Sequence, residues 1–73
     1  MARVLHLLKG DDPLALRLVA EQRAAGDDVT VALLPGAPDL ALPAGVTPHR
    51  VPDDWSWEAL LERIFEADQV ITW

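Results

Sequence analysis

Cysteine is absent from this 73-residue sequence, and serine occurs once, at Ser56. Without cysteine the chain has no disulfide, no thiolate metal ligand, no nucleophilic thiol and no residue that carries a persulfide. The two histidines, His6 and His49, have no serine or cysteine nucleophile placed near them, so no catalytic triad is indicated. The sequence therefore favours a protein that is not an enzyme.

Basic residues are also few, since six Lys and Arg stand against twelve Asp and Glu for a net charge of −6. Binding to nucleic acid requires clustered Lys and Arg, so this balance argues against direct nucleic-acid contact. The first apolar run is about six residues long, which is too short for a signal-peptide core or a membrane span. Neither glycine-rich nucleotide-binding motif is present. We expect a cytoplasmic protein with no cofactor and no membrane contact.

The beginning of the chain has the pattern of a strand, a polar turn and a helix. Arg3–Leu8 is apolar at nearly every position, as a strand covered on both faces requires, and is expected to be the central strand. Asp12 is placed to cap a helix from Pro13 to about Ala25 that ends at Gly26. The residues predicted to face inward from this helix are Leu14, Leu18 and Val19.

The rest of the chain predicts three more strands and a second helix. The strands are Asp28–Leu34, a short Val46–Val51 that contains a proline, and Asp68–Trp73. Five of the six prolines lie in Pro35–Pro52, which predicts a loop without a helix. The second helix is expected to be capped at Ser56 or, as an alternative, at Asp54. Its apolar stripe, with spacing i, i+3, i+4, i+7 and i+8, consists of Trp57, Leu60, Leu61, Ile64 and Phe65.

This pattern predicts a single α/β domain over residues 1–73. We expect a small, open, mostly parallel sheet of about four strands in the order 2-1-3-4 with two helices, similar to flavodoxin. Two helices do not cover both faces of such a sheet, so either the proline-rich loop or a partner subunit should cover the remainder. Because the core of so short a chain is marginal, an oligomer is expected.

In this strand order, the turns after the first and third strands meet at the carboxyl edge of the sheet, where ligands bind in such folds. The candidate ligand-binding residues are Lys9, Gly10, Asp11, Asp12, Asp53 and Asp54. Carboxylates beside a lysine suit a hard cation or a phosphate group. The alternative is that these aspartates are helix caps and turn formers. No metal-ligand set is assigned.

His6 and the tryptophans are the other residues of interest. His6 lies in the middle of the first strand and is expected to be a hydrogen-bonded core or interface residue. Trp57 belongs to the apolar stripe and is expected in the core. Trp55 and Trp73 both fall at the carboxyl edge of the sheet, where they either anchor an interface or pack peripherally. The candidate interface residues are therefore His6, Trp55 and Trp73.

Three features resemble the DsrH/TusB-like branch of the DsrE/DsrF sulfur-relay family. They are L-H-L-L at Leu5–Leu8, the small α/β pattern, and A-D-Q-V-I-T-W at Ala67–Trp73. The resemblance implies a cytoplasmic subunit that assembles with sister subunits of the same fold and takes part in persulfide relay, for tRNA thiolation or sulfur oxidation.

In the working subunits of that family, a cysteine carries the sulfur. Since this chain has none, we expect a non-catalytic subunit that completes an oligomer with itself or with sister DsrE/DsrF-like subunits. The alternative hypothesis is a small metal- or phosphate-binding α/β protein that uses the acidic turns after the first and third strands.

Overall fold

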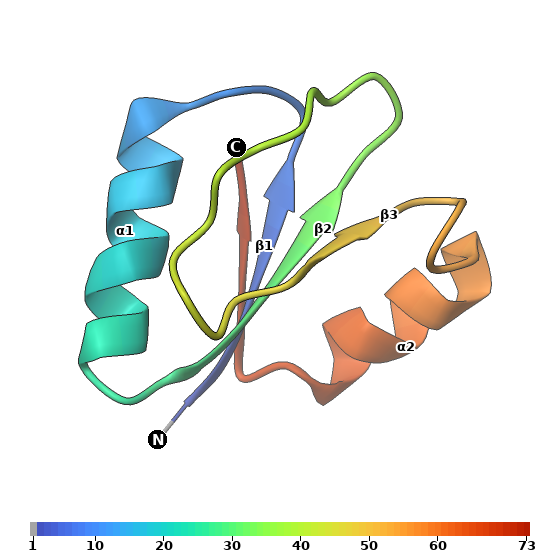
Figure 1. The fold of residues 1–73 in the computed structure, drawn as a ribbon. Helices are drawn as coiled ribbons and strands as arrows, with labels where there is room; N and C mark the ends of the chain where they lie inside the picture. The colour runs from blue at the N-terminus through green and yellow to red at the C-terminus, as the bar shows by residue number, and fades with distance from the viewer. Residues whose placement is uncertain (1) are drawn as a thin grey trace.

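The computed structural model describes residues 2–73, in which four parallel strands form one sheet with a helix on each face (Figure 1). The elements are β1 (Arg3–Leu8), α1 (Pro13–Ala24), β2 (Asp28–Leu33), β3 (Pro48–Arg50), α2 (Trp57–Glu66) and β4 (Gln69–Thr72). The predicted α/β class, with an open parallel sheet and two helices, is confirmed. Within residues 2–73, neither helix has the length and apolar character needed to cross a bilayer.

The strands lie in the order β3-β2-β1-β4. As expected, β1 is central: Leu5 is in register with Thr30 of β2 on one side and with Val70 of β4 on the other. The expected order 2-1-3-4 placed the third strand beside β1, whereas β3 pairs with the outer side of β2. This position suits a three-residue strand that begins with Pro48, because proline has no N–H to donate and is tolerated at a sheet edge.

Helix α1 has the termini that its sequence predicts. The Oδ1 atom of Asp12 accepts hydrogen bonds from the backbone N–H groups of Leu14 (3.0 Å) and Ala15 (3.4 Å), and Pro13 takes the first helical position. Gly26 follows the helix with a φ of 91°, a conformation that favours glycine. Local capping chemistry therefore sets both ends of α1.

This cap leads to a testable prediction. Asp12→Ala should lower the free energy of unfolding by about 1 kcal/mol, because two backbone N–H groups lose their acceptor. The matched control is Asp11→Ala, which changes the neighbouring exposed aspartate and should cost less than about 0.5 kcal/mol. Urea denaturation followed by circular dichroism measures both values. Equal losses for the two variants would show that the Asp12 cap does not stabilise the helix.

The inward face of α1 is not the predicted one. Ala15 and Val19 are fully buried and Leu18 is partly buried, but 67% of Leu14 is exposed. Ala15 and Val19 are four residues apart and therefore lie on the same face of the helix. Leu14 directly precedes Ala15, so its side chain points about 100° away from that buried face. The prediction was therefore right for Val19 and wrong for Leu14.

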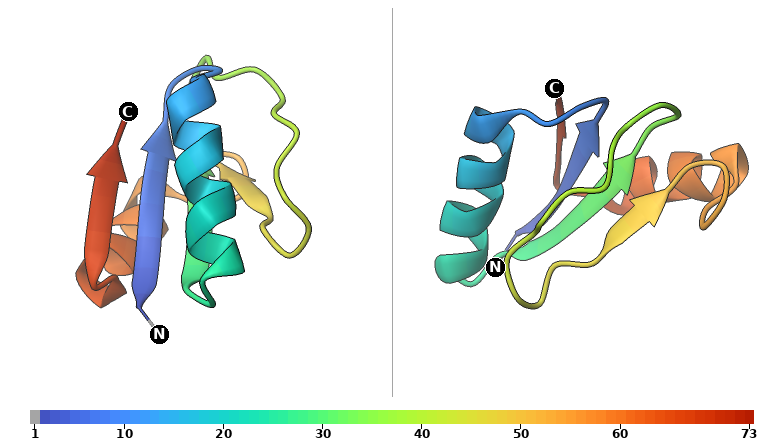
Figure 2. Two further views of the ribbon diagram at one scale, coloured as in Figure 1. Left: turned by 90° about the vertical axis from the view of Figure 1, so that its left-hand side faces the viewer. Right: turned by 45° about the horizontal axis from the view of Figure 1, so that its top comes forward.

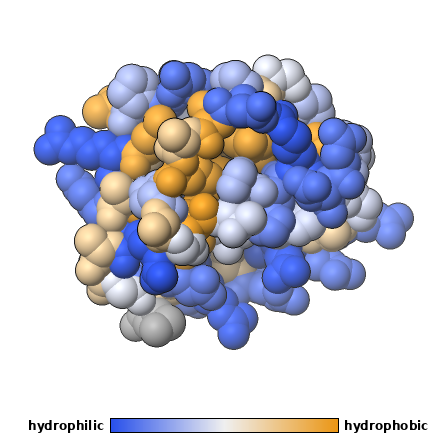
Figure 3. Space-filling model, viewed as in Figure 1, coloured by the Kyte–Doolittle hydropathy of each residue, from blue (hydrophilic) through white to orange (hydrophobic). Residues whose placement is uncertain are grey.

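The α1 face of the sheet is covered by α1 and by the segment 34–47. Figure 2 shows α1 in front of the sheet with this segment beside it. In the view of Figure 3, hydrophobic side chains gather near the middle, within a hydrophilic surround. The buried cluster on this face is Leu8, Ala15, Val19, Val29, Val31, Leu33, Ala37 and Val46. The proline-rich segment thus supplies the cover for one face that a third helix would otherwise provide.

Arg50 connects this segment to β3. Its guanidinium donates to the carbonyl oxygen of Ala37 (2.8 Å) and to the Oδ1 atom of Asp39 (2.6 Å). The ion pair with Asp39 is largely exposed, so the bond to the carbonyl group is the better shielded of the two. The loop is therefore fastened at a defined place although it contains no helix.

The opposite face is covered by α2, and Trp55 from the turn before this helix packs on the same cluster. The buried residues there are Leu5, Ala32, Val51 and Leu60. This cluster is smaller than the one beneath α1, and the amino-terminal ends of β1 and β2 remain uncovered beside α2. The expectation that two helices leave part of the sheet open is met on this face.

Candidate functional site

The acidic turns expected to form one ligand site leave strands that are not neighbours. Lys9–Asp12 follows β1 and Asp53–Asp54 follows β3, and β2 lies between these strands. The predicted juxtaposition depended on β3 pairing with β1 and is therefore wrong. Within residues 2–73, no group of three or more His, Asp or Glu side chains is placed to hold a metal ion.

Two of these aspartates have structural roles. Asp12 caps α1, and the Oδ2 atom of Asp54 accepts a hydrogen bond from the backbone N–H of Arg50 (2.8 Å). Lys9, Asp11 and Asp53 are exposed, and Gly10 is partly exposed. For Asp12 and Asp54, the alternative interpretation as caps and turn formers describes the structure.

His6 is fully buried, so within this chain it is a core residue and not an exposed interface residue. Its Nε2 atom lies 2.6 Å from the amide oxygen of Gln22, and its Nδ1 atom lies 2.9 Å from the indole Nε1 of Trp73. Since an indole N–H only donates, Nδ1 is the acceptor and Nε2 carries the proton that Gln22 accepts. Both polar atoms of the ring are thus satisfied.

This contact also accounts for Trp73, which was a candidate interface residue. The Trp73 side chain is partly buried and packs against the cluster beneath α1. Its ring lies nearly parallel to the ring of His6, with the planes 15° apart and the centroids 6.1 Å apart. Its backbone N–H donates to the carbonyl oxygen of Leu7, which extends the pairing of β4 with β1. The residue therefore joins the end of β4 to the centre of the fold.

Trp55 is likewise engaged within the chain. Its ring stacks on His49, with centroids 4.3 Å apart and planes 11° from parallel, and the guanidinium carbon of Arg63 lies 5.2 Å from the ring centroid. Trp55 also packs against the cluster beneath α2. These contacts support the peripheral-packing alternative for Trp55.

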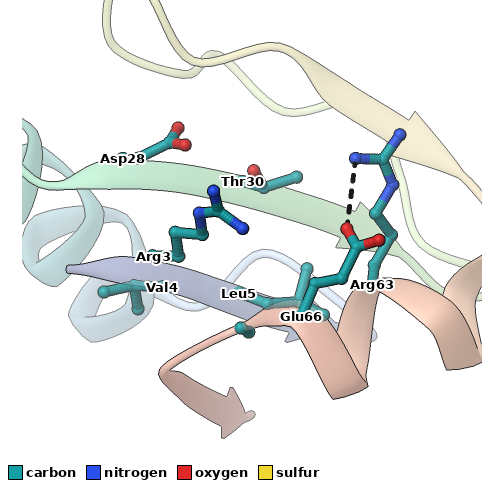
Figure 4. A pocket seen from close by; sticks show the side chains of 8 residues that line it. Arg3, Val4, Leu5, Asp28, Thr30, Arg63 and Glu66 are labelled. Atoms are coloured by element: carbon teal, nitrogen blue, oxygen red, sulfur yellow. Dashed lines mark ion pairs between the residues drawn. The ribbon is translucent and has the colours of Figure 1, made fainter.

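An open pocket of about 340 Å³ lies beside α2, over the amino-terminal ends of β1 and β2 (Figure 4). Its lining residues are Arg3, Val4, Leu5, Asp28, Thr30, Arg63, Glu66 and Ala67. This pocket has no signature in the sequence because its residues come from three separate segments and share no motif. The only signal in the sequence was the alternation of side-chain direction along a strand, which places Arg3 and Leu5 of β1 on the same face of the sheet.

The charges of this pocket balance. Two arginines face two carboxylates, and one pair, Arg63 and Glu66, is joined at 4.0 Å. Opposite charges in equal number give no net attraction for either an anion or a cation. The pocket is therefore best described as sheet surface that α2 leaves uncovered.

The apolar stripe of α2 is the second unexpected feature. Leu60 is buried and Ile64 is partly buried against the sheet, as the spacing predicts. Trp57, Leu61 and Phe65 belong to the same stripe, yet they are 54%, 52% and 79% exposed. The expectation that Trp57 lies in the core is wrong for the isolated chain. We call Trp57, Leu61 and Phe65 the α2 row.

The α2 row is the main candidate for a functional surface. Single exposed apolar residues are ordinary, but adjacent large ones that include two aromatic rings are typical of surfaces that bind another protein. Hydrophobic periodicity shows which residues are apolar and cannot show what covers them. For that reason the sequence indicated these residues as one apolar stripe but placed Trp57 in the core.

No family model, curated protein or solved structure matches this chain. The function is therefore inferred from the arrangement of its own residues.

Proposed function

We propose that this protein is a non-catalytic subunit that completes an oligomer, of the kind that the DsrH/TusB-like branch of the sulfur-relay family contributes. The observation that carries the proposal is the α2 row, which leaves large apolar side chains in water on a domain with a small core. Burial of apolar area is the main driving force for association, so this surface gains most from a partner.

The sulfur-relay part of the proposal is supported by how the resembling segments meet. Leu5–Leu8 lies in β1, and the end of Ala67–Trp73 pairs with that strand. The side chains of His6 and Trp73, one from each segment, are joined by a hydrogen bond of 2.9 Å. The two segments that carry the resemblance thus form one unit of structure.

The absence of cysteine defines the role that we propose. A subunit with no thiol takes no persulfide, so its contribution is to shape or stabilise the assembly in which sister subunits transfer sulfur. We expect no transferable sulfur on this chain after incubation with a persulfide donor.

The test is the solution mass by light scattering over a tenfold or wider dilution range, alone and with a purified pair of DsrE- and DsrF-like subunits. We expect the chain, 8.0 kDa as a monomer, to enter a larger species in at least one of these samples. Leu61→Glu should weaken this assembly by about tenfold or more, because it places a charge in the apolar contact.

The matched control is Leu14→Glu, which changes another largely exposed leucine on the opposite helix and should leave the assembly unchanged. Circular dichroism confirms that both variants are folded. A chain that stays at its monomer mass both alone and with the subunits would overturn the proposed function.

A further inference from the structure

The α2 row is bordered by a second row of a different kind. Trp57, Leu61 and Phe65 are each followed directly by a glutamate, so Glu58, Glu62 and Glu66 repeat with the same four-residue spacing. Residues four apart lie above one another on a helix, so the two rows run side by side along α2. All of these glutamates are exposed. The helix thus presents an apolar row with an acidic border.

The basic residue within α2 does not neutralise this border. The guanidinium of Arg63 lies near the Trp55 ring, and its one ion pair among residues 2–73 is with Glu66, at the limiting distance of 4.0 Å. Glu58 and Glu62 take part in no ion pair among the described residues. The acidic border therefore keeps most of its negative charge.

The charge pattern disfavours a second copy of this chain as the partner. Each copy carries a net charge of −6, and contact between two α2 rows would bring two acidic borders to one interface. Like charges across an interface oppose association and are a usual means of rejecting the wrong partner. A partner with basic residues beside its apolar side chains gains from both rows.

The exposed area indicates how large that partner segment is. An aromatic side chain offers roughly 150–250 Å², so the exposed parts of Trp57 and Phe65 together offer roughly 200–330 Å². This is well below the surface of a standard interface between globular proteins. It matches one short amphipathic segment laid along the helix.

We propose that the α2 row binds a basic amphipathic segment of a different protein. Apolar side chains of that segment pack on Trp57, Leu61 and Phe65, and its Lys or Arg residues lie opposite Glu58 and Glu62. This inference rests on the proposed function and names the chemistry of the partner subunit.

The test uses two synthetic helical peptides with the same leucine pattern, one with lysine and one with glutamate at every polar position. Isothermal titration calorimetry with the full chain should show that the Leu/Lys peptide binds at least about tenfold more tightly than the Leu/Glu peptide. Its affinity should fall as salt rises, because exposed charges are screened. Equal affinities for the two peptides would overturn the inference.

Substitutions test whether the Leu/Lys peptide binds beside Glu58 and Glu62. Glu58→Gln with Glu62→Gln should weaken Leu/Lys binding by about fivefold or more, because two favourable charge contacts are lost. The control is Asp11→Asn with Glu21→Gln, which removes the same charge from the α1 side of the chain and should change the affinity by less than about twofold. Equal losses for the two double variants would show attraction to the overall charge only and would contradict the inference.

Two other results would also overturn it. One is self-association that Phe65→Glu abolishes, which would make a second copy the occupant and leave the proposed function standing. The other is adsorption to phosphatidylcholine vesicles that the same variant abolishes, without peptide binding. The two proposals can also fail separately. If the Leu/Lys peptide binds in a manner that depends on Glu58 and Glu62 but the chain joins no DsrE- or DsrF-like subunit, the α2 row is supported as the binding surface and the sulfur-relay assignment is overturned.

Discussion

Leu8→Ala is expected to lower the free energy of unfolding by about 3 kcal/mol, within the range for fully buried leucines. Leu8 has no exposed surface and lies at the end of β1, within the cluster that α1 and the segment 34–47 cover. Truncation removes apolar burial and leaves a cavity among side chains that belong to different elements, so little relaxation is expected. Urea denaturation followed by circular dichroism measures the loss.

This effect is large for a domain of this size. A 73-residue domain has a total stability of roughly 4–11 kcal/mol, so the variant should lose between about a quarter and three quarters of its stability. The matched control is Leu14→Ala, the same substitution at a residue that is 67% exposed, with an expected change within about 0.5 kcal/mol. Similar losses for the two variants would mean that α1 packs through a different face.

The comparison of Leu8 with Leu14 shows what the sequence predicts well and what it does not. The ends of α1 follow from Asp12, Pro13 and Gly26, which act on the backbone within a few residues. Its rotation about the helix axis does not follow from local chemistry. Leucines lie on several sides of α1, so hydrophobic spacing alone selects no face.

The strand order is another property that local patterns do not determine. The strand positions and the central place of β1 could be predicted because an apolar run requires cover on both sides. The side of the sheet that β3 joins depends on the path of the segment 34–47, and that path depends on long-range contacts such as Arg50 with Ala37. The predicted juxtaposition of the two acidic turns depended on this order and was wrong with it.

The α2 row could be predicted from the sequence only in part. The periodic stripe predicted both the helix and its apolar residues, and Leu60 is buried as expected. Burial requires a second surface, however, and the sheet offers room for only part of the stripe. The residues of the candidate functional surface could therefore be predicted from the sequence, but their exposure could not.

The second large effect is expected at His6. His6→Leu should lower the free energy of unfolding by about 2–3 kcal/mol, although leucine fills most of the same space. The substitution leaves the indole N–H of Trp73 and the amide oxygen of Gln22 without their partner in a part-buried site. Unfolding in urea gives this value, and near-ultraviolet circular dichroism reports the environment of Trp73.

A double-mutant cycle separates the hydrogen bond from simple packing. Trp73→Phe keeps an aromatic ring and removes the donor, which should cost about 1 kcal/mol. In the double variant both partners of the bond are gone, so the combined loss should fall short of the sum by about 0.5–1 kcal/mol. Strict additivity would show that the bond between His6 and Trp73 contributes nothing. Coupling would instead show that the end of β4 is held to the central strand by a specific polar contact.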